Sequence, residues 1–206
     1  TIMQIAINGL KEAVYVNTVA VCGKINNVMN CTFNAIGPTM ASYVGQNVGA
    51  RRMDRVQEGV KKGVAAGLAV AVVLVAAILV FGENLMRMFT TTEEVVTLGV
   101  HMMRILALGY IAMAVTQSLS GVMRGAGDTL TPMWISFVTT IVIRMPLAYG
   151  IAYLTRSETL PNGTPDSVFI SLLIAWVMGA VLTSVFYRRG KWRKMAHLSA
   201  GEGEGA

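Results

Sequence analysis

GVAAGLAVAVVLVAAILVFG, residues 63–82, runs for 20 positions without a charged side chain. An α-helix needs about 20 apolar residues to cross the hydrocarbon core of a bilayer. Two further stretches share this property, since residues 105–123 are uncharged over 19 positions and residues 167–187 over 21. One such run could be the core helix of a soluble protein. Three of them within 206 residues indicate an integral membrane protein.

The composition of the chain agrees with a membrane location. Charged residues make up 14% of the sequence and the mean hydropathy is +0.57, whereas an average soluble domain is about 25% charged. The net charge of +6 could indicate a nucleic acid partner. Because the sequence offers no soluble basic face that could hold a duplex, we expect no nucleic acid binding. The expected partner is the lipid bilayer, with the cations orienting the loops.

Apolar runs separated by polar loops predict an all-α, polytopic membrane helix bundle. About five complete transmembrane helices are expected, near residues 15–44, 63–82, 98–123, 133–154 and 167–187. The end of a sixth helix is expected at residues 1–8, followed by a short turn at 8–13. Because the sequence begins inside an apolar stretch, a chain truncated at its N-terminus is expected. The transmembrane unit should cover residues 1–194, and residues 195–206 should form a flexible cytoplasmic tail.

Lys and Arg residues divide unequally between the two sides that alternating helices create. One side receives eleven of them: Arg51, Arg52, Arg55, Lys61, Lys62, Arg124, Arg188, Arg189, Lys191, Arg193 and Lys194. The other side receives Lys11, Arg87 and Arg156, with Arg104 as a fourth if its side chain snorkels. Cytoplasmic loops carry an excess of Lys and Arg. The first side, including the C-terminus, is therefore expected to face the cytoplasm, with Trp192 in the aromatic belt at the headgroups.

A row of amide side chains distinguishes the helix predicted at residues 15–44. Asn27, Asn30 and Asn34 follow i, i+3, i+7 spacing and share one helix face, and Lys24 lies near that face. Polar groups inside a bilayer must face protein or water. One interpretation is the wall of a water-filled cavity, and the other is hydrogen bonding between packed helices. The sequence leaves both open.

Lys24 and Arg144 are the two unexpected charges within predicted spans. Each lies about 10–15 Å from a helix end at 1.5 Å per residue. Pro146 removes a hydrogen bond to the carbonyl of Val142, so that carbonyl could accept from Arg144 or from water. Charges at this depth mark pathways or buried pairs, although snorkelling is the alternative. We expect a functional or pairing role for both cations.

The chain lacks the common signatures of catalysis and metal binding. It contains no GxxxxGK[ST] loop, no HExxH sequence and no cluster of Cys and His, so neither ATP hydrolysis nor any other enzymatic activity is expected. Cys22 and Cys31 are nine residues apart, about 13 Å along one predicted helix. A disulfide requires Cα atoms within about 7 Å. The two cysteines are therefore expected to be free thiols.

Two polar segments follow predicted helices and carry the most specific pattern in the chain. The first, GQNVGARR at residues 45–52, contains Gln46, Asn47 and Gly49, which could reverse the chain and cap exposed carbonyls. The second, RGAGDTLTP at residues 124–132, contains Arg124, Gly125, Gly127, Asp128 and Pro132. Asp128 and Thr129 are placed to cap the helix that follows. This short connection predicts two antiparallel neighbouring helices.

These two segments, in this order and two helices apart, resemble the second half of a multidrug and toxic compound extrusion (MATE) transporter. The resemblance covers about residues 6–193 and implies the second lobe of a twelve-helix fold, so that the N-terminal lobe would be a missing partner. It further implies export of small organic cations in exchange for protons or sodium ions, without other cofactors. Some members of the family carry an acidic residue where this chain has Thr116 and Gln117. A coupling carboxylate would then belong to the missing half.

The predicted substrate-binding wall contains six residues: Lys24, Asn27, Asn30, Asn34, Gln117 and Arg144. Three alternatives remain. A flippase of lipid-linked saccharides has a similar architecture, but it favours several basic residues in its cavity. The string Gly-x-Gly-Asp at residues 125–128 also occurs in intramembrane aspartyl proteases, yet no acidic residue lies within a predicted span to serve as the second carboxylate. Finally, the fragment alone could be inactive.

Overall fold

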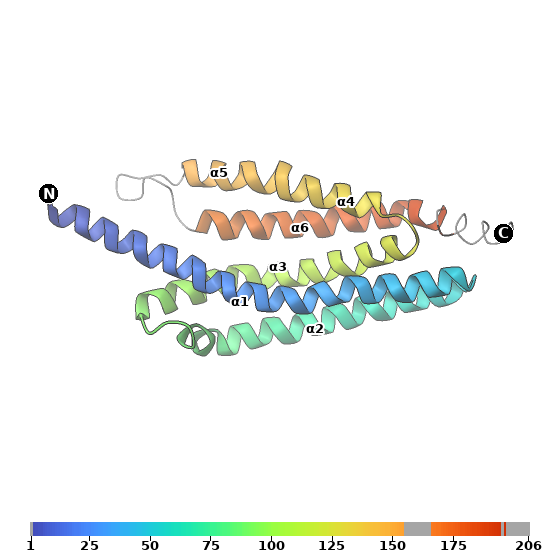
Figure 1. Ribbon diagram of the computed structural model, residues 1–206, viewed down its shortest axis with the longest axis horizontal. Coiled ribbons are helices and arrows are strands. Elements are labelled where there is room, and N and C mark those ends of the chain that lie inside the picture. The colour runs from blue at the N-terminus through green and yellow to red at the C-terminus, as the bar shows by residue number, and fades with distance from the viewer. Residues whose placement is uncertain (1, 155–165, 195, 197–206) are drawn as a thin grey trace.

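A computed structural model describes residues 2–154, 166–194 and 196, and these residues form helices and turns without a strand (Figure 1). The elements are α1 (Ile2–Gly49), α2 (Met53–Arg87), α3 (Glu93–Gly125), α4 (Leu130–Phe137), the π-helix η1 (Val138–Arg144), α5 (Met145–Leu154) and α6 (Asp166–Arg189). The elements α4, η1 and α5 follow one another without a break and form a single rod. The described residues therefore form five helical rods.

Four of the rods are long and apolar enough to cross a membrane. These are α2, α3, the rod from Leu130 to Leu154, and Phe169–Arg189 of α6. The chain is thus a polytopic membrane bundle, as the sequence predicts. The helix α1 lies alongside them but is not in this set, because asparagines interrupt its apolar residues.

The turn expected at residues 8–13 is wrong, because α1 runs unbroken for 48 residues from Ile2 to Gly49. A glycine inside a helix costs only about 1 kcal/mol relative to alanine. The residues after Gly9 are Leu, Lys, Glu and Ala, all strong helix formers, and no proline interrupts them. The expected sixth helix end is consequently the first part of α1.

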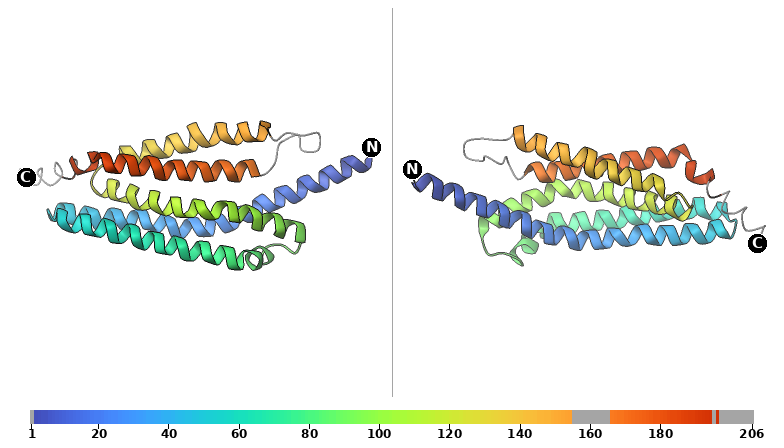
Figure 2. Two further views of the ribbon diagram at one scale, coloured as in Figure 1. Left: turned by 180° about the vertical axis from the view of Figure 1, so that it is seen from behind. Right: turned by 45° about the horizontal axis from the view of Figure 1, so that its top comes forward.

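The helix α3 occupies the centre of the bundle and packs against α1, α2 and α6 (Figures 1 and 2). The helices α1 and α3 run in the same direction, since Tyr110 contacts Asn26 and Gln117 contacts Asn34 further along both helices. The α4–η1–α5 rod packs mainly on α6. The predicted antiparallel arrangement of α3 and the rod is confirmed, with only residues 126–129 between them.

Two apolar cores hold these helices together. The larger core joins α1, α2, α3 and α6 and includes Phe33, Met102, Leu106 and Tyr110, all with at most 2% exposure. The second lies where α1 meets α2 and α3 meets α4, and it includes Val44, Val56 and Val122. The second core also contains Trp192, which is 1% exposed. The expectation that Trp192 faces the headgroups is therefore wrong, since its large apolar ring packs inside the bundle.

The loops alternate between the two ends of the bundle as the charge pattern predicts. The connections at residues 50–52 and 126–129 and the end of α6 lie at one end, which we call the basic end (Figure 1). The connection at residues 88–92 lies at the opposite end. The expected loop around Arg156, and the expected tail apart from Ala196, lie outside the described residues.

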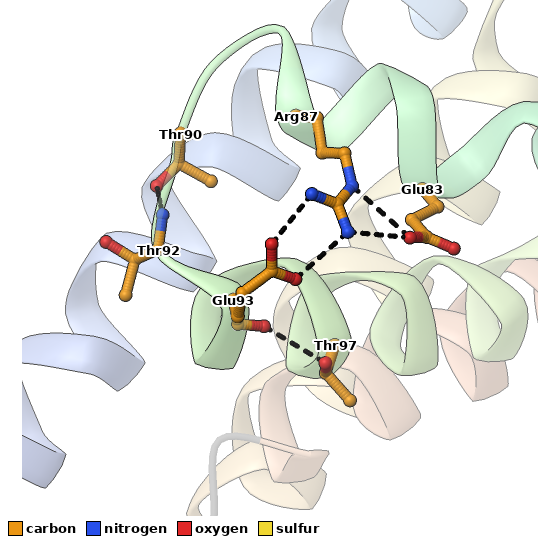
Figure 3. A network of polar contacts seen from close by, with 6 residues as sticks. All are labelled: Glu83, Arg87, Thr90, Thr92, Glu93 and Thr97. Atoms are coloured by element: carbon orange, nitrogen blue, oxygen red, sulfur yellow. Dashed lines mark hydrogen bonds and ion pairs between the residues drawn. The ribbon is translucent and has the colours of Figure 1, made fainter.

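The connection between α2 and α3 is held by one arginine (Figure 3). The sequence predicts helices near residues 63–82 and 98–123, but α2 extends to Arg87 and α3 begins at Glu93. The guanidinium of Arg87 donates to Glu83 at 2.9 Å and to Glu93 at 2.7 Å. This arrangement ties the last turn of α2 to the first turn of α3. The loop is therefore shorter than expected.

Candidate functional site

The asparagines of α1 form the first part of a polar row between α1 and α3. The amide of Asn30 donates to the backbone carbonyl of Asn26 at 2.9 Å and to its side-chain oxygen at 3.1 Å. The hydroxyl of Tyr110, on α3, donates to the same side-chain oxygen at 2.9 Å. Asn26 was not among the predicted site residues. Its spacing of four from Asn30 was the signal that could have identified it.

Aromatic rings hold Tyr110 in place for this contact. Its ring stacks on Phe33 of α1, with centroids 5.7 Å apart and planes 10° apart. On its other side it meets Trp176 of α6 at 5.5 Å. The ring of Tyr110 is therefore fixed between α1 and α6 while its hydroxyl donates to the side chain of Asn26. The part of the row formed by Asn26, Asn30 and Tyr110 is thus a rigid feature of the bundle.

Two predicted site residues far apart in the sequence meet in the second part of the row. The amide nitrogen of Gln117 on α3 donates to the side-chain oxygen of Asn34 on α1 at 2.7 Å. The glycine one turn further along α1, Gly37, lies beside Gln117 and beside the guanidinium of Arg124. The structure thus brings the predicted residues Asn30, Asn34 and Gln117 to the seam between α1 and α3 and adds Asn26 and Tyr110 to it.

Lys24 and Asn27 lie outside this row of contacts. Both side chains are exposed on α1, and neither makes a hydrogen bond or an ion pair with any residue that the structure describes. The same exposed side of α1 carries further polar side chains, namely Asn17, Thr32 and Thr39. A helix inside a membrane bundle cannot present such a surface to lipid at low cost. We therefore expect this side of α1, which also exposes Val28, to meet water or other protein.

Arg144 occupies an irregular part of the backbone. It is the last residue of η1, a seven-residue π-helix that ends two residues before Pro146. The sequence predicted a released carbonyl at Val142, and the structure shows instead that the whole turn widens to π geometry. Arg144 is half-buried and forms no ion pair within the described part of the chain. Its segment packs on α6 rather than on α1, so it stands apart from the asparagine row.

A polar cavity of about 190 Å³ opens between α3 and α4, close to the basic end. Gln117 borders it, so the Asn34–Gln117 pair separates this cavity from the exposed side of α1. Hydroxyl groups of Thr116, Ser120 and Ser136 line it together with the guanidinium of Arg124. No carboxylate lines this cavity, and the described residues contain no cluster of metal-binding side chains. The cavity therefore offers neutral hydrogen-bonding groups and one cation.

The segment at residues 45–52 reverses the chain at a different residue from the one expected. Asn47 donates its side-chain amide to the carbonyl of Tyr43 at 2.8 Å, which lies within α1 and is not one of the free carbonyls at its end. The backbone carbonyl of Gln46 accepts from Ala50 at 3.0 Å. The residue with left-handed backbone geometry is Arg51, with φ of 57°, and Gly49 is the last helical residue. Reversal of the chain by Gly49 is therefore wrong.

The segment after α3 behaves largely as predicted. Gly127 has a φ of 91°, a value that side chains disfavour. One oxygen of Asp128 accepts from the backbone N–H of Thr131 at 3.1 Å and the other accepts from its hydroxyl at 2.8 Å. Asp128 thus caps α4, whereas Thr129 forms no side-chain cap. Pro132 lies in the first turn of α4, where a backbone N–H needs no partner.

Close helix contact explains Gly125. A Cβ atom at this position would lie 2.9 Å from the Cα of Ala41, and one at Gly121 would lie 2.9 Å from the Cβ of Met40. Small residues four positions apart on a membrane helix allow such an approach. The two glycines let α3 lie directly against the backbone of α1, which brings Asn34 and Gln117 within hydrogen-bonding distance.

Comparisons with known proteins match most of this chain. A family model described as MatE matches residues 1–150. The probable multidrug resistance protein YoeA of Bacillus subtilis is 24% identical over 165 residues, which are 78% of this chain and 36% of the relative. The probable multidrug resistance protein NorM of Thermotoga maritima is 25% identical over 164 residues, 80% of this chain and 34% of the relative.

A solved structure supports the fold. The crystal structure of the eukaryotic MATE transporter AtDTX14 superposes with a TM-score of 0.79 at 18% identity, over 92% of this chain and 41% of that chain. This likeness concerns the arrangement of helices. The chain spans about a third of the length of the curated relatives it matches.

Proposed function

This chain belongs to the MatE family, and we propose that it forms one lobe of a secondary active exporter of organic compounds. The proposed substrates are cationic and amphipathic, and protons or sodium ions move in the opposite direction. Alternating access would follow from rocking of this lobe against a second helical lobe around a site near the middle of the membrane. The support for this proposal comes from the names of the relatives and from the polar side of α1.

The exposed polar side of α1 is the observation that carries the proposal. The helix lies alongside the membrane-spanning helices α2 and α3, yet Lys24, Asn27 and Asn34 are exposed on it. Lipid would penalise these groups. A water-filled pathway between two lobes would hydrate them and would let them contact a substrate. The six proposed contact residues remain Lys24, Asn27, Asn30, Asn34, Gln117 and Arg144.

The proposed contact residues differ in whether their side chains already form hydrogen bonds within the protein. Lys24 and Asn27 are free to meet a substrate, while Asn30, Asn34 and Gln117 already bond to protein. Because a bonded amide must break one contact to accept a substrate, its removal should affect both stability and transport. A coupling carboxylate would come from the second lobe, since the polar cavity beside Gln117 has none.

Drug efflux tests the proposal directly. The complete gene product that carries this chain is expressed in a host lacking its own exporters, and each of the six residues is replaced by alanine. Asn27→Ala is expected to reduce efflux of a cationic dye without lowering thermal stability. Val72→Ala, on the exposed apolar side of α2, is the matched control and should keep full efflux. Unchanged efflux in all six variants would remove the site assignment.

The protease alternative has a specific structural obstacle. Both oxygens of Asp128 are bonded to Thr131, and the residue is 1% exposed at the basic end. The described residues place no second carboxylate in contact with it. Asp128→Asn should therefore leave transport largely intact, because the amide oxygen still accepts from the backbone of Thr131. Loss of a peptide-cleaving activity in this variant would favour the protease.

The flippase alternative requires a different role for Lys24, which is exposed, and Arg144, which is half-buried. A saccharide diphosphate carrier would rely on Lys24 and Arg144 to bind phosphate. Replacing both by glutamine should then abolish accumulation of lipid-linked sugars on the outer side. Dye efflux by the unsubstituted protein without any accumulation of lipid-linked sugars would support the exporter.

A further inference from the structure

An apolar groove runs between α4 and α6 near the basic end of the bundle. Its volume is about 400 Å³, and six of its eight lining residues are apolar, among them Trp134, Val138, Leu182 and Phe186. Both helices belong to rods that are long and apolar enough to cross a membrane, so the groove lies on a part of the molecule that can meet lipid. Trp134 is 58% exposed there. A groove of this kind suits a flexible hydrocarbon chain.

The groove ends at a cation that the chain places there by a sharp turn. The helix α6 ends at Arg189, and Gly190 takes a φ of 73°, which changes the direction of the chain before residues 191–194. Lys191 comes next and lines the groove. The turn uses a conformation that glycine adopts without steric cost. The position of Lys191 thus follows from the backbone and not from a freely moving terminus.

Trp192 anchors this turn in the second core. Its indole nitrogen donates to the carbonyl of Tyr187 at 3.0 Å, and its ring stacks on Tyr187 with centroids 5.2 Å apart. The residue is 1% exposed. Because Trp192 is fixed, its neighbour Lys191 is held beside α4. This explains why a large aromatic residue next to five cations is buried instead of facing the headgroups.

The electrostatics at this end favour an anion. Lys191 is exposed and has no ion-pair partner among the described residues. The guanidinium groups of Arg189 and Arg193 lie over the rings of Phe186 and Trp192, which leaves their charges uncompensated by carboxylates. The carboxylate of Asp128 bonds to Thr131, which lines the groove, but Asp128 is only 1% exposed, whereas Lys191 is exposed at the mouth. The groove therefore joins an apolar channel to a positive mouth.

We propose that this groove binds one acyl chain of an anionic phospholipid, with the lipid phosphate held by Lys191. The membrane supplies such lipids at high concentration, and basic pockets between transmembrane helices recognise anionic headgroups. The acyl chain satisfies the apolar lining while the phosphate meets the cation at the bilayer surface. This site is separate from the polar side of α1 and does not depend on the proposed transport function.

Lipid binding to the complete purified protein tests the charge at the mouth. Native mass spectrometry compares phosphatidylglycerol with phosphatidylcholine carrying the same acyl chains. Phosphatidylglycerol is expected to bind more tightly, and Lys191→Gln should weaken it roughly fivefold, as expected for one lost cation near the membrane surface. Lys194→Gln removes the same charge outside the groove and should change binding less than about twofold. Equal effects of the two variants would overturn the proposal.

Fluorescence tests the groove itself and does not depend on a variant that fills it. Phosphatidylglycerol with acyl chains brominated near the headgroup should quench Trp134, and Trp134→Phe should remove this quenched component. The same lipid should quench less in Lys191→Gln. An absence of quenching at Trp134 would show that polypeptide covers the groove. Displacement of the lipid by inorganic phosphate would show a site for free anions. Either result would overturn the proposal.

Discussion

At the scale of single residues, the α1–α3 contact depends on the absence of side chains. Gly121 and Gly125 face the backbone of α1, where a Cβ atom would collide with Gly37 and Ala41. Glycine within a helix otherwise lowers stability by about 1 kcal/mol relative to alanine. These glycines therefore lower the intrinsic stability of α3 but allow a close contact with α1 that positions Asn34 and Gln117.

Gly121→Ala should destabilise the protein, because the added methyl group has no room against Gly37. Overpacking of this kind costs about 1–3 kcal/mol, and thermal unfolding of the purified protein in detergent measures it. Gly23→Ala is the matched control, since nothing lies within 4 Å of a Cβ atom at that position of α1. The control should be neutral or slightly stabilising. A Gly121→Ala protein as stable as the control would contradict the close contact.

Asn34 and Gln117 should show energetic coupling, because the 2.7 Å hydrogen bond joins them across two helices. In membrane bundles such bonds contribute about 0.6 kcal/mol on average. A double-mutant cycle with Asn34→Leu and Gln117→Leu, read by thermal unfolding, measures the coupling. Asn27→Leu paired with Gln117→Leu is the control and should be additive. Additivity in both cycles would mean that the two amides face an open cavity instead of each other.

At the scale of elements, the rod from α4 to α5 owes its irregularity to Pro146. The ring of a proline clashes with the carbonyl four residues earlier and leaves it without a donor. Here the seven residues Val138–Arg144 adopt π geometry just before the proline. A π turn inserts extra backbone, which changes the direction in which the following side chains point. The direction of Arg144 is thus set by a neighbour in the sequence.

Pro146→Ala is expected to restore α geometry and to rotate the segment around Arg144 relative to α4. One residue of register corresponds to about 100° on a helix with 3.6 residues per turn. The labelling rate of Arg144→Cys by a thiol reagent, in a protein lacking Cys22 and Cys31, should change when Pro146→Ala is added. Met133→Cys precedes η1 and should label at an unchanged rate. Equal rates at position 144 with and without the proline would contradict this account.

At the scale of the whole molecule, positive charge is concentrated at one end of the bundle. The basic end carries the cations of the segments at residues 45–52 and 124–132 and of the α6 terminus, while Arg87 at the opposite end is paired with Glu83 and Glu93. Because cytoplasmic loops attract Lys and Arg, we propose that the basic end lies in the cytoplasm. The C-terminus would then be cytoplasmic, with the protein in the plasma membrane.

Reporter fusions test this orientation. A reporter placed after Arg55 should be found in the cytoplasm, and one placed after Thr91 should be found outside it. The two positions lie at opposite ends of α2, so one crossing of the membrane separates them. Both reporters on the same side would contradict the membrane crossing by α2. Reversed locations would leave the fold intact and invert the proposed orientation.

The sequence by itself determined the class of fold, the approximate helices and the alternation of loops, because these depend on local features. Apolar length specifies a membrane helix, and Gly127, Asp128 and Pro132 specify a turn and a helix start within a few residues of one another. The capping by Asp128 was predictable for this reason. The continuity of α1 was not, since nothing beyond a weakly unfavourable glycine distinguished a turn from a helix there.

Tertiary structure alone decided which polar groups meet. Asn26 and Tyr110 are 84 residues apart in the sequence, and Asn34 and Gln117 are 83 apart. The periodicity of a single helix cannot indicate which residue of another helix it will contact. The same is true of Trp192, whose position next to cations suggests an interface until the second core is seen to accept its ring. Local sequence sets which face of a helix is polar, but the packing of one helix on another decides whether that face is bonded, buried or exposed.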